Sequence, residues 1–404
     1  MNNKKSILFG VFVIGLNVRH VINMKKKRLL FLCFSLFFFF SCNKADRKAY
    51  IDLDGYTTIV ASSIQETLLD TFSFKKPNIV ILETIDESIL GEIKRISFDD
   101  NKLFIFDSKV MQVLVFDING KYINKIFHKG QGPKEYIQIS DFAIDTDKKQ
   151  ILLLCDIPNK LMYFTYEGVL LKEEKLGVYY SRLVLDSNYL YFEKMHDIKI
   201  KSSQIDIINQ KTGEKDGGLP QLDIQNYLFT KGNSLNKSNN ILYVRRFDNS
   251  IYEITDGKII KKYNIDFGKH SFPDRLMQVE ETATILKECS ENEYIYSMAN
   301  AVNSEHYIMF KTNRGLFLYD KSKDLLNGYR QLQYTKWGMP FYSYMPLENT
   351  CKIVCSIDDP SFIKHSIEHD PPIERTSELF LQLYELSSKL VEDNNPVLFI
   401  YEFK

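Results

Sequence analysis

The sequence has few of the residues that mark several common protein classes. Trp337 is the only tryptophan among 404 residues, so the repeated Trp-Asp signature of WD40 propellers is absent. Six cysteines are too few for a disulfide framework in a chain of this length. Cys351 and Cys355 stand four residues apart in an expected strand, roughly 13 Å along it and beyond the ~7 Å Cα limit of a disulfide. The cysteines are therefore expected to be free thiols.

Long apolar runs and an excess of positive charge are also missing. The apolar run Leu29–Phe40 is roughly half of the ~20 residues that a transmembrane helix needs. The formal net charge is zero, but residues 1–41 hold seven basic residues and no acidic ones. The remainder, with 45 Lys and Arg against 52 Asp and Glu, carries a net charge of −7. Nucleic acids require clustered basic residues, so we expect no nucleic-acid partner.

Residues 24–42 have the layout of a bacterial lipoprotein signal. Basic residues at 25–28 precede the apolar run, and the small residue Ser41 stands directly before Cys42. In such signals the cysteine becomes the lipidated first residue of the mature chain. The pattern predicts lipidation at Cys42, and hence a membrane partner through the lipid anchor.

The predicted signal peptide covers residues 1–41, with the true start at Met24. A single long signal is the alternative to that start. Phe39 and Phe40 stand where such signals usually have Leu and a small residue, so ordinary cleavage beside a coincidental cysteine is the other interpretation. Asn43 does not provide the aspartate that retains lipoproteins in the inner membrane. We therefore expect an outer-membrane lipoprotein, facing either the periplasm or the exterior.

Glycine-ended turns recur along the rest of the chain. They end at Gly120, Gly168, Gly213 and Gly257, at spacings of 48, 45 and 44 residues, and each follows an apolar strand-like run. Hairpin units of ~40–50 residues are typical of β-propeller blades. The pattern predicts an all-β fold, a six-bladed β-propeller over residues 76–404. Residues 42–75 lack a clear period and are predicted to be a tether.

Two helical insertions are expected to interrupt the repeat. Pro273–Cys289 has apolar residues at helical spacing, and so does Glu374–Val391. The segment IVILETI near residue 80 is expected to close the ring by pairing with the last blade, because closure removes free sheet edges.

The segment FDINGKYINKIFHKGQGPKEY, followed by ISDFAID, resembles the NHL-like six-bladed β-propeller lipoproteins of Gram-negative bacteria. The most specific part is a turn motif that normally reads G-x-G-P-G-E-Y, and the chain departs from it at Lys134. The resemblance implies a fold and a location, but no activity. The matching residues are Gly130, Gly132, Pro133, Glu135 and Tyr136.

Two motifs invite a catalytic interpretation. His365 to His369 spells H-x-x-E-H, a zinc-peptidase pattern, but Asp370-Pro371-Pro372 would end the required helix at once. The Gly-Gln-Gly run at 130–132 lacks the lysine and hydroxyl of a phosphate loop. We therefore expect no metal and no cofactor.

The chain is rich in aromatic residues, with 24 tyrosines and 29 phenylalanines. Most are expected to pack in strands. A ligand-facing aromatic group near blade edges is the alternative, and its candidates are Tyr179, Tyr180, Phe341, Tyr342 and Tyr344.

These patterns favour a lipid-anchored extracytoplasmic propeller that binds a ligand or an envelope protein or glycan. The alternative is a hydrolase or lyase that acts on a sugar or peptide at the channel mouth. It would need several His or carboxylate side chains that converge there, and no spacing in the sequence demands this.

The anchor is directly testable. Replacing Cys42 with alanine (Cys42→Ala) removes the lipid attachment point, so the protein is expected to move from the membrane fraction to the soluble fraction after cell breakage. Cys33→Ala, within the same signal, serves as the control and should leave the protein in the membrane fraction. Membrane association of the Cys42→Ala protein would show that another anchor operates.

Overall fold

The structure is a computed structural model, and the chain separates into two compact units, Met1–Arg47 and Lys48–Lys404. All described residues belong to the second unit. They are residues 51–195, 202–224, 231–336, 338–360, 363, 381, 384–385, 387–388 and 394–404.

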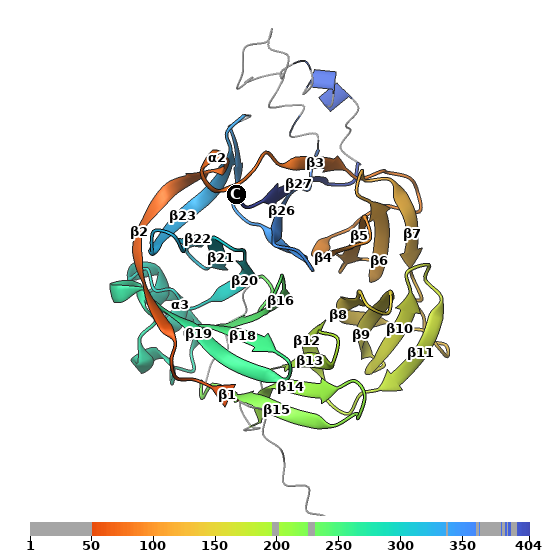
Figure 1. Ribbon diagram of the computed structural model, residues 1–404, viewed down its shortest axis with the longest axis horizontal. Coiled ribbons are helices and arrows are strands. Elements are labelled where there is room, and N and C mark those ends of the chain that lie inside the picture. The colour runs from red at the N-terminus through yellow and green to blue at the C-terminus, as the bar shows by residue number, and fades with distance from the viewer. Residues whose placement is uncertain are drawn as a thin grey trace, which may run out of the picture. The chain divides into compact units, whose positions relative to one another are not determined.

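The second unit is built almost entirely of β-strands, which confirms the predicted all-β class. Its sheets curl around a common centre in a propeller-like arrangement (Figure 1). The strands up to residue 185 are β1 (Ile51–Asp52), β2 (Thr57–Leu69), β3 (Asn78–Ile81), β4 (Ile93–Asp99), β5 (Lys102–Asp107), β6 (Gln112–Asp117), β7 (Tyr122–Ile126), β8 (Gln138–Asp145), β9 (Gln150–Ile157), β10 (Lys160–Thr165), β11 (Leu170–Lys175) and β12 (Tyr180–Leu185).

The later strands continue the same pattern of antiparallel neighbours. They are β13 (Tyr189–Lys194), β14 (Ser203–Asn209), β15 (Lys215–Pro220), β16 (Leu235–Lys237), β17 (Ile241–Arg245), β18 (Asp248–Thr255), β19 (Lys258–Asp266), β20 (Met298–Asn303), β21 (Tyr307–Thr312), β22 (Gly315–Asp320), β23 (Leu325–Tyr334), β24 (Met339–Phe341), β25 (Met345–Glu348), β26 (Lys352–Ile357) and β27 (Val397–Glu402). The described helical segments are α2 (Asp70–Ser73), η1 (Gly268–His270), η2 (Asp274–Leu276) and α3 (Thr282–Glu291).

Consecutive strands form antiparallel groups that lie next to one another around the centre. The strands β8 to β11 and β12 to β15 make two separate four-stranded sheets. The other groups are joined into mixed sheets by parallel pairs: β25 with β4, and β2 with both β19 and β23. The apolar core lies between neighbouring groups; for example, the rings of Phe106 on β5 and Phe142 on β8 are 6.1 Å apart.

Part of the segment expected to be a tether instead lies in a sheet, so that prediction is wrong for residues 51–52 and 57–69. β2 pairs in parallel with β19 through Thr57 to Val60 and with β23 through Ala61 to Leu69. Both neighbours are held by backbone hydrogen bonds, while most side chains of β2 are exposed or half-buried. A strand held in this way needs no regular apolar period, which is why its sequence resembles a linker.

The pairing expected near residue 80 is confirmed. β3 runs antiparallel to β27, with Ile79 opposite Phe399. The carboxylate of Glu402, on β27, forms ion pairs with Lys75 and with Lys352 (2.8 Å for the latter). These contacts join the beginning of the described chain to its last strand.

The recurring glycines all lie between the third and fourth strands of a group. Gly120 lies between β6 and β7, Gly168 between β10 and β11, Gly213 between β14 and β15, and Gly257 between β18 and β19. Their φ angles are 88°, 86°, 68° and 74°, a left-handed region that disfavours residues with a Cβ atom.

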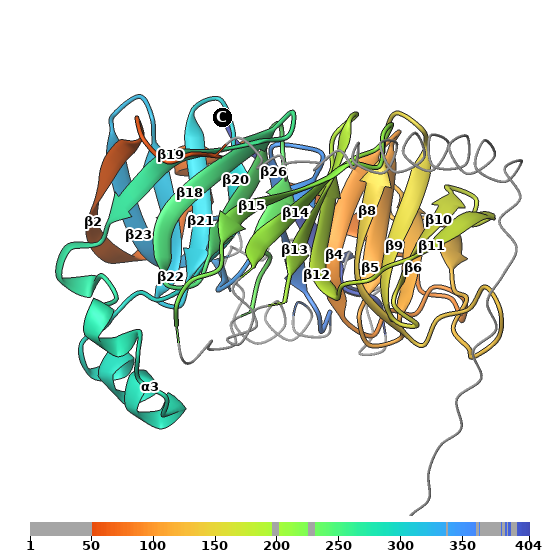
Figure 2. The ribbon, with the colours of Figure 1, turned by 90° about the horizontal axis from the view of Figure 1, so that it is seen from below.

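The first predicted insertion is helical only in part. Instead of one helix over Pro273–Cys289, η2 and α3 are separate, and α3 begins at Thr282. The break changes the buried face: Ile285 and Cys289 are buried, whereas Leu286 is 45% exposed. Leu276, in η2, packs into the apolar cluster that also contains Ile285 and Cys289. α3 projects away from the sheets (Figure 2). The second predicted insertion lies almost wholly outside the described residues.

Gly120 and Gly213 allow a matched test of the turns. Both have positive φ, so replacing either with alanine should cost ~1 kcal/mol of unfolding free energy. A Cβ atom on Gly120 would also lie 2.1 Å from the carbonyl oxygen of Ile81 in β3, whereas Gly213 has no atom within 4 Å of that position. We expect Gly120→Ala to lose at least ~2 kcal/mol more than Gly213→Ala in urea unfolding. Equal losses of unfolding free energy in the two variants would show that the close contact with β3 adds nothing to the cost of Gly120→Ala.

Candidate functional site

The inner strands form a closed circuit at the centre of the ring. β4 contacts β8, which contacts β12, and the circuit continues through β16, β20 and β25 back to β4. Figure 1 shows the labelled members of this set closest to the centre. Side chains from these strands can therefore meet although they are far apart in sequence.

Arg95, on β4, is the hub of this circuit. Its side chain is 1% exposed and forms ion pairs with Asp141 of β8 and, at 3.1 Å, with Glu348 of β25. It also donates hydrogen bonds to the carbonyl oxygens of Leu183 (3.1 Å) and Leu235 (3.4 Å). One guanidinium thus links five inner strands.

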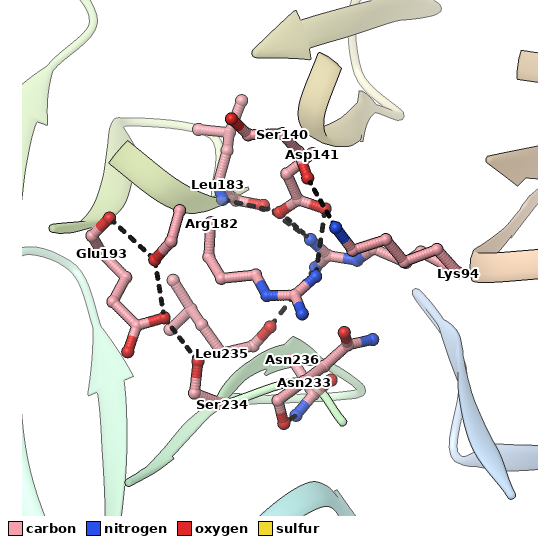
Figure 3. Close-up of polar contacts among 12 residues, drawn as sticks. Lys94, Ser140, Asp141, Arg182, Leu183, Glu193, Asn233, Ser234, Leu235 and Asn236 are labelled. Carbon is pink, nitrogen blue, oxygen red and sulfur yellow. Dashed lines mark hydrogen bonds and ion pairs between the residues drawn. The ribbon is translucent and has the colours of Figure 1, made fainter. Parts of the chain in front are cut away.

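Asp141 is fully buried and contacts further residues besides Arg95. Its Oδ2 accepts a hydrogen bond from the backbone N–H of Leu183 at 2.8 Å. Its Oδ1 lies 3.6 Å from Nη1 of Arg182, which is ion-pair distance but too long for a hydrogen bond. In Figure 3, Arg182 and Lys94 both point toward Asp141. Nζ of Lys94 contacts the carbonyl oxygen of Ser140 at 3.4 Å.

The sixth inner strand joins the circuit through an asparagine. Asn300, on β20, accepts a hydrogen bond from the backbone N–H of Asn233 (2.7 Å) and donates one to the carbonyl oxygen of Tyr344 (2.6 Å). On the other side, Oε2 of Glu348 accepts the backbone N–H of Lys237 at 2.9 Å. Every inner strand therefore contributes at least one polar contact near the centre of the ring.

Several buried atoms of this network have no hydrogen-bond partner within the described residues. A buried polar atom is normally paired with another protein group or with ordered water. These atoms are Arg95 Nε, Asp141 Oδ1, Arg182 Nη1, Asn236 Oδ1 and Glu348 Oε1.

Burial and charge act against each other at the hub. Burial opposes the charge of Arg95, but attraction to Asp141 and Glu348 outweighs it, so the pKa of Arg95 is raised. Burial raises the pKa of Glu348, and Arg95 offsets only part of that rise. Burial also lowers the pKa of Lys94, and repulsion from Arg182 lowers it further.

A small cavity lies beside the hub, toward the C-terminal ends of the inner strands. Its volume of about 10 Å³ has room for about one water molecule. Ser97, Lys237 and Asn349 line it together with Arg95 and Glu348.

The predicted aromatic candidates do not form one exposed group. Tyr180, Phe341 and Tyr344 are 3%, 4% and 2% exposed, so for these three the prediction is corrected. The hydroxyl of Tyr180 donates to Asp206 at 2.7 Å, and that of Tyr344 donates to the carbonyl oxygen of Asn300 at 2.9 Å. These three aromatic residues pack in the apolar core of the sheets. Tyr179 and Tyr342 are exposed, at 58% and 66%.

The Gly130–Tyr136 motif forms the loop between β7 and β8. Oε2 of Glu135 accepts the backbone N–H of Gly132 at 2.7 Å and would lie 2.0 Å from a Cβ atom on Gly130. The loop's own carboxylate thus fills the space that a phosphate would need. Pro133 lies within this loop. Lys134 has φ 66°, a left-handed conformation that favours glycine.

Tyr136, at the end of the motif, is fully buried. Its hydroxyl donates to the carbonyl oxygen of Met111 at 3.0 Å, and it accepts the backbone N–H of His128 at 3.2 Å. The motif therefore anchors the crossing from one sheet to the next.

Some predicted sites lie outside the described residues: the lipidation site Cys42 and the histidines His365 and His369. Within the described ranges, no group of three His, Cys, Asp or Glu side chains could hold a metal ion. The described helices include none that is long and apolar enough to cross a membrane.

The sequence contained a signal for the hub that periodicity alone does not reveal. Arg95, Asp141 and Arg182 each lie in the first strand of a group, and they recur at about the spacing of the glycine turns. A charged residue at the same place in successive first strands indicates side chains that converge on an axis.

Comparison with known proteins identifies relatives by sequence profile and by fold. The profile of a domain of unknown function, DUF4934, matches residues 57–402. A protein of Bacteroides fragilis described as exported has a similar structure, with a TM-score of 0.70 and 20% identity over 86% of this chain and 100% of that one. A DUF4221 family member from Bacteroides vulgatus has a TM-score of 0.48 and 12% identity, over 82% of this chain and 97% of that one. No curated protein matches the chain.

The hub can be tested by removing one charge. Asp141→Asn leaves Arg95 with Glu348 as its remaining charged partner inside the protein, and breaking a buried pair typically costs ~3–5 kcal/mol. Glu288→Gln breaks the exposed pair with Arg275 and should cost less than ~1 kcal/mol. Urea unfolding of both variants measures the difference. A loss below ~1 kcal/mol for Asp141→Asn would contradict the structural role of the hub.

Proposed function

Because the chain belongs to the DUF4934 family, whose function is unknown, we propose its role from the site: a binding or interaction module that uses the centre of the ring. We further propose that the ring is a six-bladed β-propeller, anchored outside the cytoplasm by lipid on Cys42. The succession of antiparallel strand groups supports the blade count. The fold shared with a Bacteroides protein described as exported supports the location.

The unpartnered polar atoms at the hub are the observation that carries the binding role. Propellers usually bind partners where the inner strands end around the central axis, and the inner strands of this chain meet in one circuit. Buried donors and acceptors without partners are costly, and a ligand or ordered water that satisfies them is stabilised in return.

We call one end of the ring the mouth. It is formed by Lys94, Arg182, Gly232, Lys311 and Ser343. β25 runs parallel to β4, with Leu347 opposite Ile96, so Ser343 lies at the same end as Lys94. Lys311 Nζ donates to Ser343 Oγ at 2.8 Å, and Arg182 Nη2 donates to the carbonyl oxygen of Gly232 at 3.2 Å.

Site-specific photo-crosslinking in cells tests this role. Tyr342, 66% exposed beside Ser343 of the mouth, is replaced by a photoreactive phenylalanine analogue. Val169, 60% exposed, lies in the β10–β11 turn at the opposite end of its sheet and provides the matched control. We expect a discrete adduct from position 342 and none from position 169. No adduct at 342, or the same adduct at both positions, would contradict binding at the mouth.

A further inference from the structure

Four outermost strands of the ring carry features that prevent pairing with another chain. β3, β7, β11 and β15 each stand at the end of a sheet and have a single partner strand. Positions 172–175 of β11 are all charged, β15 has two glycines and ends in Pro220, and β3 and β7 are only four and five residues long. Charge, proline and short length are the usual means by which a protein keeps a sheet edge from pairing with another molecule.

β2 lacks these features. With 13 residues it is the longest of the described strands, and it contains neither proline nor glycine. Six of its residues are β-branched, which favours extended backbone. Glu66 is its only charged residue and forms an ion pair with Arg330 at 3.3 Å. The surface of β2 therefore presents no net charge to an approaching strand.

Each half of β2 has one partner strand and one unpaired edge. From Thr57 to Val60 its only partner among the described strands is β19, and from Ala61 to Leu69 it is β23. The register with β23 shifts between Ala61 and Ile64 and is then regular to Leu69. β2 lies at the perimeter of the ring (Figure 1), and seven of its residues are exposed, among them Val60 at 65%. An unpaired edge of this kind is a template for another extended strand.

We propose that two copies of this chain associate through β2, edge to edge and antiparallel, around a two-fold axis. A two-fold axis brings the same strand of both copies together, so the edge has to tolerate its own charge, and the neutral β2 does so. Residues 42–404 carry a net charge of −7, which opposes association through charged surfaces and favours a neutral edge. The lipid proposed at Cys42 would confine all copies to one membrane and so raise their effective concentration.

The test combines sedimentation equilibrium of the purified full-length protein, in density-matched non-ionic detergent, with amide hydrogen exchange at low and high protein concentration. We expect a mass of two chains that falls to one chain on dilution. At high concentration, exchange should slow in β2 and stay unchanged in β11, because a backbone N–H that donates to a second copy is protected. A single-chain mass at every concentration, or a dimer without protection in β2, would overturn the proposal. Co-purification of a different polypeptide that protects β2 would assign the edge to that chain instead.

Matched lysine variants assign the contact to β2. Val60→Lys and Gln65→Lys each place a charge at an exposed position of β2, and either should raise the dimer dissociation constant at least tenfold. Leu171→Lys, at a position of β11 that is 48% exposed, is the control and should leave the constant unchanged. If Val60→Lys does not fold, Gln65→Lys alone decides the test. Equal dissociation constants for Gln65→Lys and Leu171→Lys would contradict pairing through β2. Crosslinking at position 342 reports on the mouth alone, so the binding role and the dimer stand or fail separately.

Discussion

The burial of Arg95 is the constraint on which the centre of this protein depends. A charged side chain that is 1% exposed is tolerated only when its partners are present in the correct geometry. Those partners come from β8, β12, β16 and β25, so the ion pairs and hydrogen bonds form only when these strands have reached their places around the axis. The contacts of Arg95 therefore favour the one arrangement of strands in which the ring is closed.

The ends of the described chain are held by backbone pairing rather than by apolar packing alone. β2 lies between β19 and β23, strands that are far away in sequence, and β3 covers β27. β2 thereby covers the edges of both β19 and β23, which would otherwise be free to pair with another molecule, whereas β3 covers the edge of β27 and is itself the last strand of its sheet. The segment from β1 to β3 thus belongs to the sheets of the ring.

The polar centre has two sides with different properties. Toward the C-terminal ends of the inner strands, Arg95 and Glu348 line a cavity with room for about one water molecule. Toward the mouth, Lys94 and Arg182 both point toward the carboxylate of Asp141.

The sequence by itself determined the strands and their turns, because these depend on local chemistry. Apolar runs, and glycines such as Gly120 and Gly168 whose φ is positive, allowed the all-β class and the repeat to be predicted. β2 was missed because a strand held by its backbone on both sides carries no apolar period. Only the tertiary structure decided the site: Arg95, Asp141 and Glu348 lie on strands far apart in the chain. Their meeting depends on how the sheets curve around one axis, which no local pattern of residues encodes.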